Sequence, residues 1–166
     1  GMADRTITLG GYSKTFSITG WRIGYSVASA RWAQAIGAMN DLLYVCAPTP
    51  LQAGVAAGIQ ELPNSFYRDL ARDYQQKRDR FCQALAKAGL TPSIPQGAYY
   101  VLADTSRLPG TTGKARAMFL LETIGLAGVP GEAFFSGPEG TQFIRFSYAK
   151  IDSDIDDACQ RLARLG

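Results

Sequence analysis

The sequence predicts a mixed α/β fold in two parts, and three observations support this prediction. Residues 5–13 and 21–28 have the short apolar patterns of strands and lie on either side of a glycine-rich loop. Residues 65–88 carry apolar side chains at helical spacing over a long segment. After Gly89, strand and helix patterns alternate, which is typical of a small α+β domain with helices on one face of a sheet.

The individual elements follow from local patterns. Ile7 and Leu9 alternate with polar neighbours and predict the first strand, and the more apolar segment after it predicts the second. Proline residues separate the two helices that come next. We expect helices over residues 30–43, 51–62, 65–88, 114–126 and 153–165, and further strands over residues 98–104 and 141–149. The boundary is expected inside the long helix, which gives domains over residues 1–69 and 70–166.

The composition of the chain argues against nucleic-acid, metal and membrane partners. The 166 residues are 46% hydrophobic and 19% charged, with a net charge of +3, and the basic residues are dispersed among acidic ones. This is an ordinary globular balance, and no nucleic-acid partner is expected. The chain has no histidine and three widely spaced cysteines, so no metal site is expected and a reducing cytoplasm is favoured. No apolar segment is long enough for a membrane span and no signal peptide is evident, so no membrane partner is expected.

One lysine stands out in the segment GYSKTFSITGWRIGY, residues 11–25. A loop lysine is usually a solvated surface residue. The hydroxyl and apolar residues around Lys14 instead favour a lysine held away from water, whose amine is freed as a nucleophile. Such an amine forms imines with carbonyl compounds, of which pyridoxal phosphate is the common example. Arg22 and Ser13, with the glycine-rich backbone, could bind the phosphate of such a cofactor.

Residues 11–24 resemble the cofactor-attachment signature of class I/II aminotransferases, the fold-type I pyridoxal-phosphate-dependent enzymes. The shared features are a small residue before the lysine and an arginine eight positions after it, followed by an apolar and a small residue. The sequence of this segment is most similar to those of the aspartate, aromatic and kynurenine aminotransferases. The resemblance implies that Lys14 is the catalytic Schiff-base lysine, which also moves a proton, and that Ser13 and Arg22 hold the phosphate of pyridoxal 5'-phosphate.

A second arginine lies in the expected strand TQFIRFSYA. On a strand, Arg145 shares a face with its neighbours two positions away, while Ile144 and Phe146 face the other side. Since its sequence neighbours are aromatic, the guanidinium is expected to be partly desolvated and to need a planar anion. The residues alone leave an internal ion pair equally open. The family resemblance implies that Arg145 binds the α-carboxylate of the substrate with two parallel hydrogen bonds.

Weaker signals come from two other segments. The segment APTPLQAGVAAGI resembles the family region near the dimer interface, which implies a homodimer with Thr49 and Gln52 near the cofactor phosphate of the neighbouring subunit. Capping of a helix start is the better-supported alternative for these two residues. The segment GAYYVLAD resembles the family strand beside the substrate, which makes Gly97 and Tyr99 weak substrate-binding candidates, although strand aromatics are usually core residues.

The loop around residues 128–135 departs from the family pattern. Glu132 stands where a small hydroxyl residue commonly follows Pro-Gly, and Phe135 stands where a glycine follows the phenylalanine. These departures leave the conformation of the loop open.

The resemblance covers only the C-terminal part of the family. It implies the C-terminal portion of the fold-type I fold, with a remnant of the large-domain sheet over residues 1–69. In the family, the aspartate that pairs with the pyridine nitrogen and the phosphate-binding glycine-rich loop both lie upstream of the lysine. Apolar residues of the remnant are therefore expected to be exposed and covered by self-association: Ile7, Leu9, Ile23 and Val27.

The expected function is that of an aminotransferase fragment. Such an enzyme moves an amino group between an amino acid and a 2-oxo acid, and the isolated chain is expected to be inactive or nearly so. Two alternatives stay open: a non-enzymatic dimerising or ligand-binding module, and a fragment of a lyase or decarboxylase with the same fold.

Overall fold

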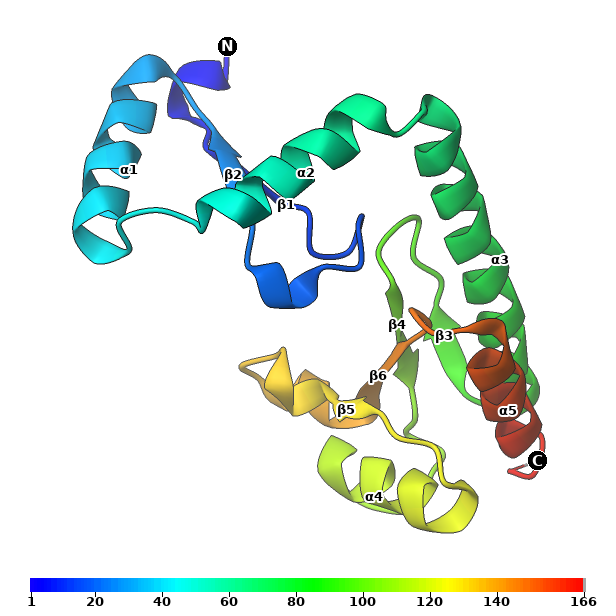
Figure 1. Cartoon of the computed structure of the whole chain (residues 1–166). Helices are drawn as coiled ribbons and strands as arrows, with labels where there is room; N and C mark the ends of the chain where they lie inside the picture. The colour runs from blue at the N-terminus through cyan, green and yellow to red at the C-terminus, as the bar shows by residue number, and fades with distance from the viewer. Residues whose placement is uncertain (166) are drawn as a thin grey trace. The chain divides into compact units, whose positions relative to one another are not determined.

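The computed structural model describes residues 1–165 and divides the chain into two compact units (Figure 1). The first unit comprises Gly1–Leu70 and the second begins at Ala71, one residue from the boundary expected from the sequence. The division falls within helix α3, Asn64–Lys87. No helix within residues 1–165 has the length and apolar character needed to cross a membrane.

The first unit is built around a two-stranded antiparallel sheet. Strands β1, Thr8–Gly11, and β2, Gly24–Val27, flank a loop that carries the 3-10 turn Thr19–Trp21. Both strands are shorter than expected, because the 3-10 turn Ala3–Arg5 precedes β1 and the 3-10 turn Thr19–Trp21 takes up the expected start of β2. Two helices follow, α1 over Ala30–Leu43 and α2 over Thr49–Glu61.

The exposure of apolar residues in this unit matches the expectation at three of four positions. Ile7, Leu9 and Val27 are exposed, by 42%, 78% and 60%. Ile23 is buried, with only 6% exposed, which corrects the expectation that it would be uncovered. Ile23 precedes β2, and its carbonyl accepts the N–H of Tyr12 at 3.2 Å.

The second unit contains a four-stranded antiparallel sheet with the strand order β3-β4-β6-β5. The central strands β4, Tyr100–Asp104, and β6, Phe143–Ser147, lie within the segments expected from the sequence. The outer strands β3, Thr91–Ser93, and β5, Val129–Pro130, were not expected. They are two or three residues long and contain proline, which is tolerated at sheet edges because an edge residue need not donate to the ladder.

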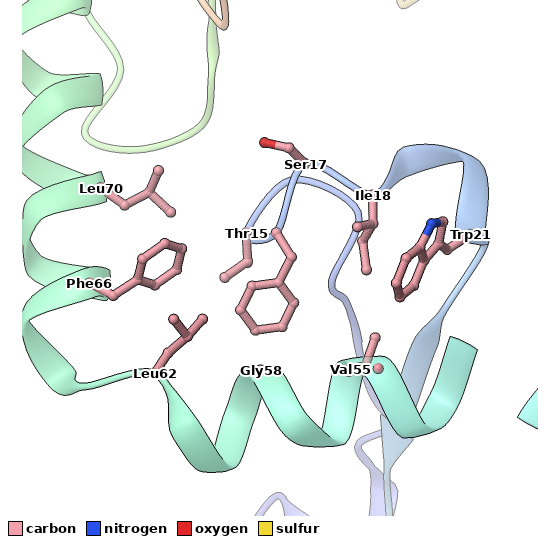
Figure 2. Close-up of a pocket in the computed structure, with 11 residues that line it drawn as sticks. Thr15, Ser17, Ile18, Trp21, Val55, Gly58, Leu62, Phe66 and Leu70 are labelled. Atoms are coloured by element: carbon pink, nitrogen blue, oxygen red, sulfur yellow. The ribbon is translucent and has the colours of Figure 1, made fainter. Parts of the chain in front are cut away.

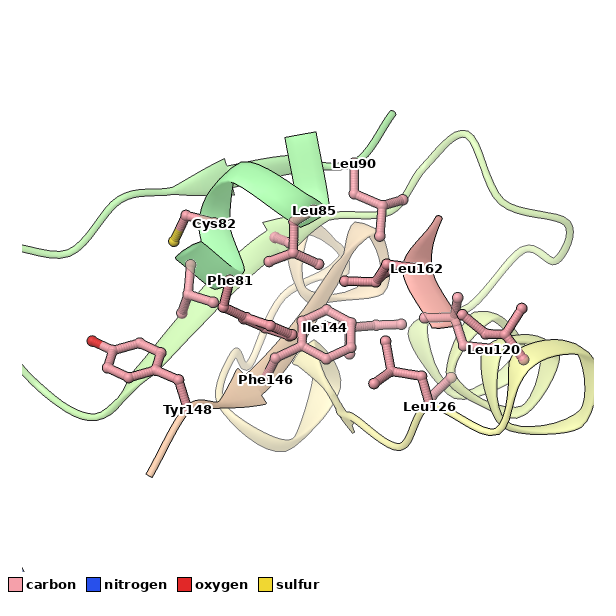
Figure 3. Close-up of a cluster of buried hydrophobic side chains, with 14 of the residues drawn as sticks. Phe81, Cys82, Leu85, Leu90, Leu120, Leu126, Ile144, Phe146, Tyr148 and Leu162 are labelled. Carbon is pink, nitrogen blue, oxygen red and sulfur yellow. The ribbon is translucent and has the colours of Figure 1, made fainter. Parts of the chain in front are cut away.

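Helices cover one face of this sheet (Figure 3). Every second residue of the central strands is buried, as Val101, Ala103, Ile144 and Phe146 show. They pack against side chains of α3, of α4 over Gly113–Ile124 and of α5 over Asp152–Leu162. The helical members of this core with the lowest exposure are Phe81, Leu85, Leu120, Ile155 and Leu162. The face expected for Ile144 and Phe146 is thus the core face, and Arg145 lies on the opposite face.

Tyr148 closes one end of this core. Its side chain is 1% exposed, and its hydroxyl donates to the carbonyls of Gly97 and Ala98 at 3.3 and 3.2 Å. Burial raises the pKa of the Tyr148 hydroxyl, because the phenolate would lose its hydration. Burial likewise raises the pKa of the Cys82 and Cys159 thiols.

Replacement of Tyr148 by Phe should alter the alkaline stability of the second unit. A raised folded-state pKa stabilises the fold fully below the unfolded pKa, about 10 for tyrosine, and this stabilisation is lost as the pH rises further. Tyr148→Phe removes two hydrogen bonds and should lower the unfolding free energy at pH 7 by about 1 kcal/mol. Above about pH 10 the variant should lose less stability than the parent chain.

Urea unfolding between neutral and alkaline pH measures this effect. Tyr44→Phe is the matched control, because Tyr44 is 54% exposed. Equal alkaline slopes for Tyr148→Phe and the parent chain would show that Tyr148 does not titrate differently in the folded state.

Candidate functional site

The lysine singled out by the sequence lies in the loop between β1 and β2, and Thr19 connects it to two further polar groups. Lys14 Nζ donates to Thr19 Oγ1 at 3.3 Å, and that hydroxyl donates to the carbonyl of Ser13 at 3.3 Å. Arg22 Nη1 donates to the carbonyl of Thr19 at 2.8 Å. The loop therefore brings the amine of Lys14 and the guanidinium of Arg22 to the same threonine, with Ser13 beside them.

The backbone of this loop turns sharply at two non-glycine residues. Ser17 and Arg22 have φ of 56° and 57°, in the left-handed region that side chains other than glycine rarely occupy. Such residues cost about 1–2 kcal/mol each. The turn at Arg22 brings its guanidinium back to Thr19, three residues earlier in the chain.

Lys14 itself is exposed in this structure. The sequence predicted that Lys14 would be held away from water. In the structure of residues 1–165 this prediction is wrong. The cause lies in the direction of the apolar side chains nearby. Phe16, Ile18 and Trp21 line a cavity in the first unit, and Lys14 is not among the residues that line it.

That cavity has a volume of about 410 Å³ and is mostly apolar (Figure 2). Leu62, Phe66 and Leu70 point into it from one side, and Ile18 and Trp21 from the other. Its lining residues within the described part of the chain include no Lys, Arg, Asp or Glu. It therefore does not offer the charged groups that bind a phosphate or a carboxylate.

Arg145 has a different environment in the second unit. Its guanidinium carbon lies 5.1 Å from the centre of the Tyr100 ring and 4.5 Å from the centre of the Phe134 ring. The side chain is half-buried, and no Asp or Glu within residues 1–165 forms an ion pair with it. The alternative of an internal ion pair is thus not realised in the described chain. Two rings flank the cation and leave its N–H donors for an anion.

The aromatic partners of Arg145 are not the ones that the sequence suggested. Phe146 faces the core, whereas Tyr100 comes from the neighbouring strand and Phe134 from the loop after β5. Tyr100 pairs with Ser147 in the register, two positions from Arg145 on the same face. Strand alternation could have identified Tyr100. No periodicity could have identified Phe134.

The two weaker substrate-binding candidates lie just before β4, which begins at Tyr100 rather than at residue 98. Gly97 is exposed and its carbonyl accepts the hydroxyl of Tyr148. The Tyr99 ring packs edge-on against the Tyr100 ring with centroids 5.1 Å apart, and its carbonyl accepts the N–H of Tyr148 at 3.0 Å. Both residues have a structural role, and their contact with substrate stays a prediction.

The two candidates for the subunit interface lie at the start of α2. Thr49 is the first helical residue, Pro48 is the N-cap, and no side-chain cap bond occurs at this terminus within the described residues. Thr49 is thus not the N-cap. Gln52 Nε2 donates to the carbonyl of Ala47 at 2.7 Å and fastens the preceding loop. Their place near a neighbouring subunit stays a prediction.

Comparisons with known proteins identify the family and the fold of the chain. The family profile of aminotransferase class I and II matches residues 1–162. The chain is 35% identical to a kynurenine–oxoglutarate transaminase of Dictyostelium discoideum over 188 aligned residues, which covers 99% of this chain and 42% of that protein. The structure of YbdL from Escherichia coli, reported with a methionine aminotransferase function, matches at 30% identity and a TM-score of 0.90 over 99% of this chain and 43% of that one. A mutant of the Thermus thermophilus aspartate aminotransferase matches with a TM-score of 0.86 at 30% identity, over 99% of this chain and 44% of its own.

The mixed α/β fold is that of the fold-type I aminotransferases, and this chain belongs to the class I and II aminotransferase family. It spans about 42% of the length of the kynurenine–oxoglutarate transaminase that it matches.

Two glycines of α2 test the packing of the apolar cavity. A Cβ on Gly58 would lie 3.5 Å from the Phe16 ring, an ordinary contact, so Gly58→Ala should raise the unfolding free energy by about 0.5–1 kcal/mol through helix propensity. A Cβ on Gly54 would lie 2.9 Å from the Trp21 ring, so Gly54→Ala must displace the indole.

Tryptophan fluorescence and urea unfolding in a Trp32→Phe background separate the two effects. Gly54→Ala should shift the Trp21 emission and Gly58→Ala should not. Gly37→Ala is the control for helix propensity, since nothing lies within 4 Å of the Cβ position in α1. An unchanged Trp21 emission in Gly54→Ala would contradict the packing described.

Proposed function

We propose that the chain is the part of a pyridoxal-phosphate-dependent aminotransferase that carries the cofactor lysine and the substrate-carboxylate arginine. The enzyme would move an amino group between an amino acid and a 2-oxo acid. Family membership supports the reaction class, and the observation that carries the assignment is Arg145, a half-buried guanidinium between two rings that forms no ion pair within residues 1–165.

The loop residues fit the aldehyde and the phosphate of pyridoxal phosphate. Lys14 Nζ is exposed and supplies the primary amine that an aldehyde requires. Arg22 and Ser13 supply a guanidinium and a hydroxyl, the donor types that bind phosphate. Thr19 contacts both cations, so the amine and the guanidinium start from one place in the loop.

When bound, the cofactor supplies an aldehyde for amino groups and a ring that withdraws electrons from the substrate Cα. Lys14 Nζ would accept the proton from that carbon and return it to the new position. The Thr19 hydroxyl, at 3.3 Å, would orient the amine for this transfer. Arg22 would hold the phosphate and so keep the reacting atoms near the lysine.

Arg145 would bind the α-carboxylate of both the amino acid and the 2-oxo acid. A guanidinium presents two parallel N–H donors to a carboxylate, which fixes the orientation of the substrate as well as its position. The Tyr100 and Phe134 rings both contact this guanidinium and so limit where a carboxylate can approach it. Gly97 and Tyr99 would lie near the substrate, since Tyr99 packs against one of these rings.

The complete enzyme would be a homodimer with Thr49 and Gln52 near the cofactor phosphate of the neighbouring subunit. The described chain covers less than half of its relatives, and the isolated chain is expected to bind the cofactor weakly and to have little or no activity.

Covalent labelling tests the role of Lys14. The chain is incubated with pyridoxal phosphate and reduced with borohydride, and peptide mass mapping locates the modified lysines. Labelling should be selective for Lys14, because Arg22 and Ser13 attract the phosphate to this loop. Lys14→Arg should abolish the selective label.

Lys114→Arg is the control, because Lys114 is an exposed lysine on α4. Equal labelling of all lysines would contradict the proposal and favour a non-enzymatic module.

Titration with a 2-oxo acid tests the role of Arg145. Pyruvate should perturb the Arg145 Nε–Hε resonance in the NMR spectrum in a saturable way. Arg145→Lys should weaken pyruvate binding by about tenfold, since an ammonium cannot form the bidentate pair.

Arg107→Lys is the control for this titration, because the Arg107 guanidinium donates to the carbonyl of Gly89. Equal pyruvate affinity in the parent chain and in Arg145→Lys would contradict the assignment of Arg145.

A further inference from the structure

The loop after β5 is attached to the start of α4 by a carboxylate. The N–H of Gly113, the first residue of α4, donates to Glu132 Oε1 at 2.7 Å. Gly113 is buried, and a Cβ there would overlap the Glu132 carboxylate and lie 3.1 Å from the carbonyl oxygen of Phe143. A glycine at this position therefore leaves the space that the carboxylate fills. The N-terminal end of a helix also favours a negative charge.

This bond is not needed to begin the helix. The N-cap of α4 is Thr112, whose Oγ1 accepts the N–H of Ala115 at 3.1 Å. A threonine N-cap already satisfies the usual requirement of a helix start. The additional bond from Gly113 to Glu132 therefore serves mainly to fix the loop that carries Glu132.

The fixed loop leads directly to the ring above Arg145. Residues Gly131–Ala133 form a 3-10 turn, in which the carbonyl of Gly131 accepts the N–H groups of Phe134 and Phe135 at 2.8 and 3.2 Å. Phe135 stacks on Phe143 of β6 with centroids 5.7 Å apart. Glu132 on one side and Phe135 on the other thus hold the turn, and Phe134 lies between them in the chain.

Phe134 is otherwise weakly held. Its side chain is 46% exposed, while its ring centre lies 4.5 Å from the guanidinium carbon of Arg145. A cation–π contact at a partly exposed site is worth little more than a side-chain rotamer change. The position of the ring therefore depends on the backbone that presents it.

We propose that Glu132 is a positioning residue for carboxylate binding. Its bond to the Gly113 N–H holds the turn that places Phe134 over Arg145, and this orients the guanidinium for the substrate carboxylate. The inference rests on the proposed function of Arg145, and it assigns a role to the residue at which this loop departs from the family pattern.

NMR of the Arg145 side chain in the 166-residue chain tests this proposal without any enzymatic activity. The Phe134 ring current should shift the Arg145 Nε–Hε and Cδ proton resonances, and Phe134→Leu defines the shift that is lost without the ring. Glu132→Ala should reproduce most of this change. The double variant should show no additional change, because both substitutions act on the same contact.

Matched variants separate positioning from charge and stability. Glu132→Gln keeps an acceptor oxygen and should behave like the parent chain. Glu132→Asp keeps the charge but shortens the side chain, and should move the Arg145 resonances. Glu139→Ala removes an exposed carboxylate from the same segment and should leave them unchanged. Circular dichroism checks that α4 is retained, as the Thr112 cap predicts.

Pyruvate titration supplies the functional outcome. Glu132→Ala should weaken pyruvate binding by about threefold to tenfold, and Glu132→Gln should restore it. Unchanged Arg145 resonances in both Glu132→Ala and Glu132→Asp would overturn the proposal. If the resonances move as expected but the parent chain binds no pyruvate, the placement of Phe134 over Arg145 by Glu132 stands, and the proposed carboxylate binding by Arg145 fails.

Discussion

The antiparallel pairing of β4 with β6 is the constraint on which the second unit depends. Leu102 pairs with Arg145, and Ala103 pairs with Ile144, so the register decides which side chains enter the core. A slip of one residue would bring Arg145 into the core and turn Ile144 and Phe146 to the open face. Burying an unpaired guanidinium costs far more than any contact of the open face could return. The hydrophobic core and the position of the arginine are therefore consequences of the same register.

The chain holds the three cations of the proposed site in two different ways. Lys14 and Arg22 are fixed by hydrogen bonds to one threonine within a short loop, so their relation depends on local backbone geometry. Arg145 is fixed by a strand and by two rings that come from other segments. Hydrogen bonds to Thr19 can exchange for bonds to a ligand, which would suit the roles proposed for Lys14 and Arg22. The Tyr100 and Phe134 rings do not occupy the N–H donors of Arg145, which would suit its proposed role of binding a substrate carboxylate.

The sequence predicted the elements whose patterns are local. Alternation identified the central strands and placed Arg145 on the face opposite Ile144 and Phe146, and helical spacing identified α3 and α5. The edge strands β3 and β5 were missed, because two or three residues with a proline carry no periodic signal. The exposure of Lys14 was predicted wrongly, because it depends on which way its apolar neighbours turn. Phe134 was missed because only the tertiary structure brings its ring to Arg145. The spacing of the two residues in the sequence follows no strand or helix period that would predict this contact.

The two units differ in how much apolar surface they bury, and this difference bears on the rigidity of each site. The apolar residues buried in the first unit are Ile23 and Val55, while those of the core in Figure 3 all belong to the second. Helix α1 buries none of its residues, and Leu42 and Leu43 are each 79% exposed. Burial of apolar area supplies about 25 cal/mol per Å², so the first unit gains little of this stabilisation from its own residues. The second unit can therefore hold Arg145 in place by itself, whereas the lysine loop would gain its rigidity when further protein surface covers β1, β2 and α1.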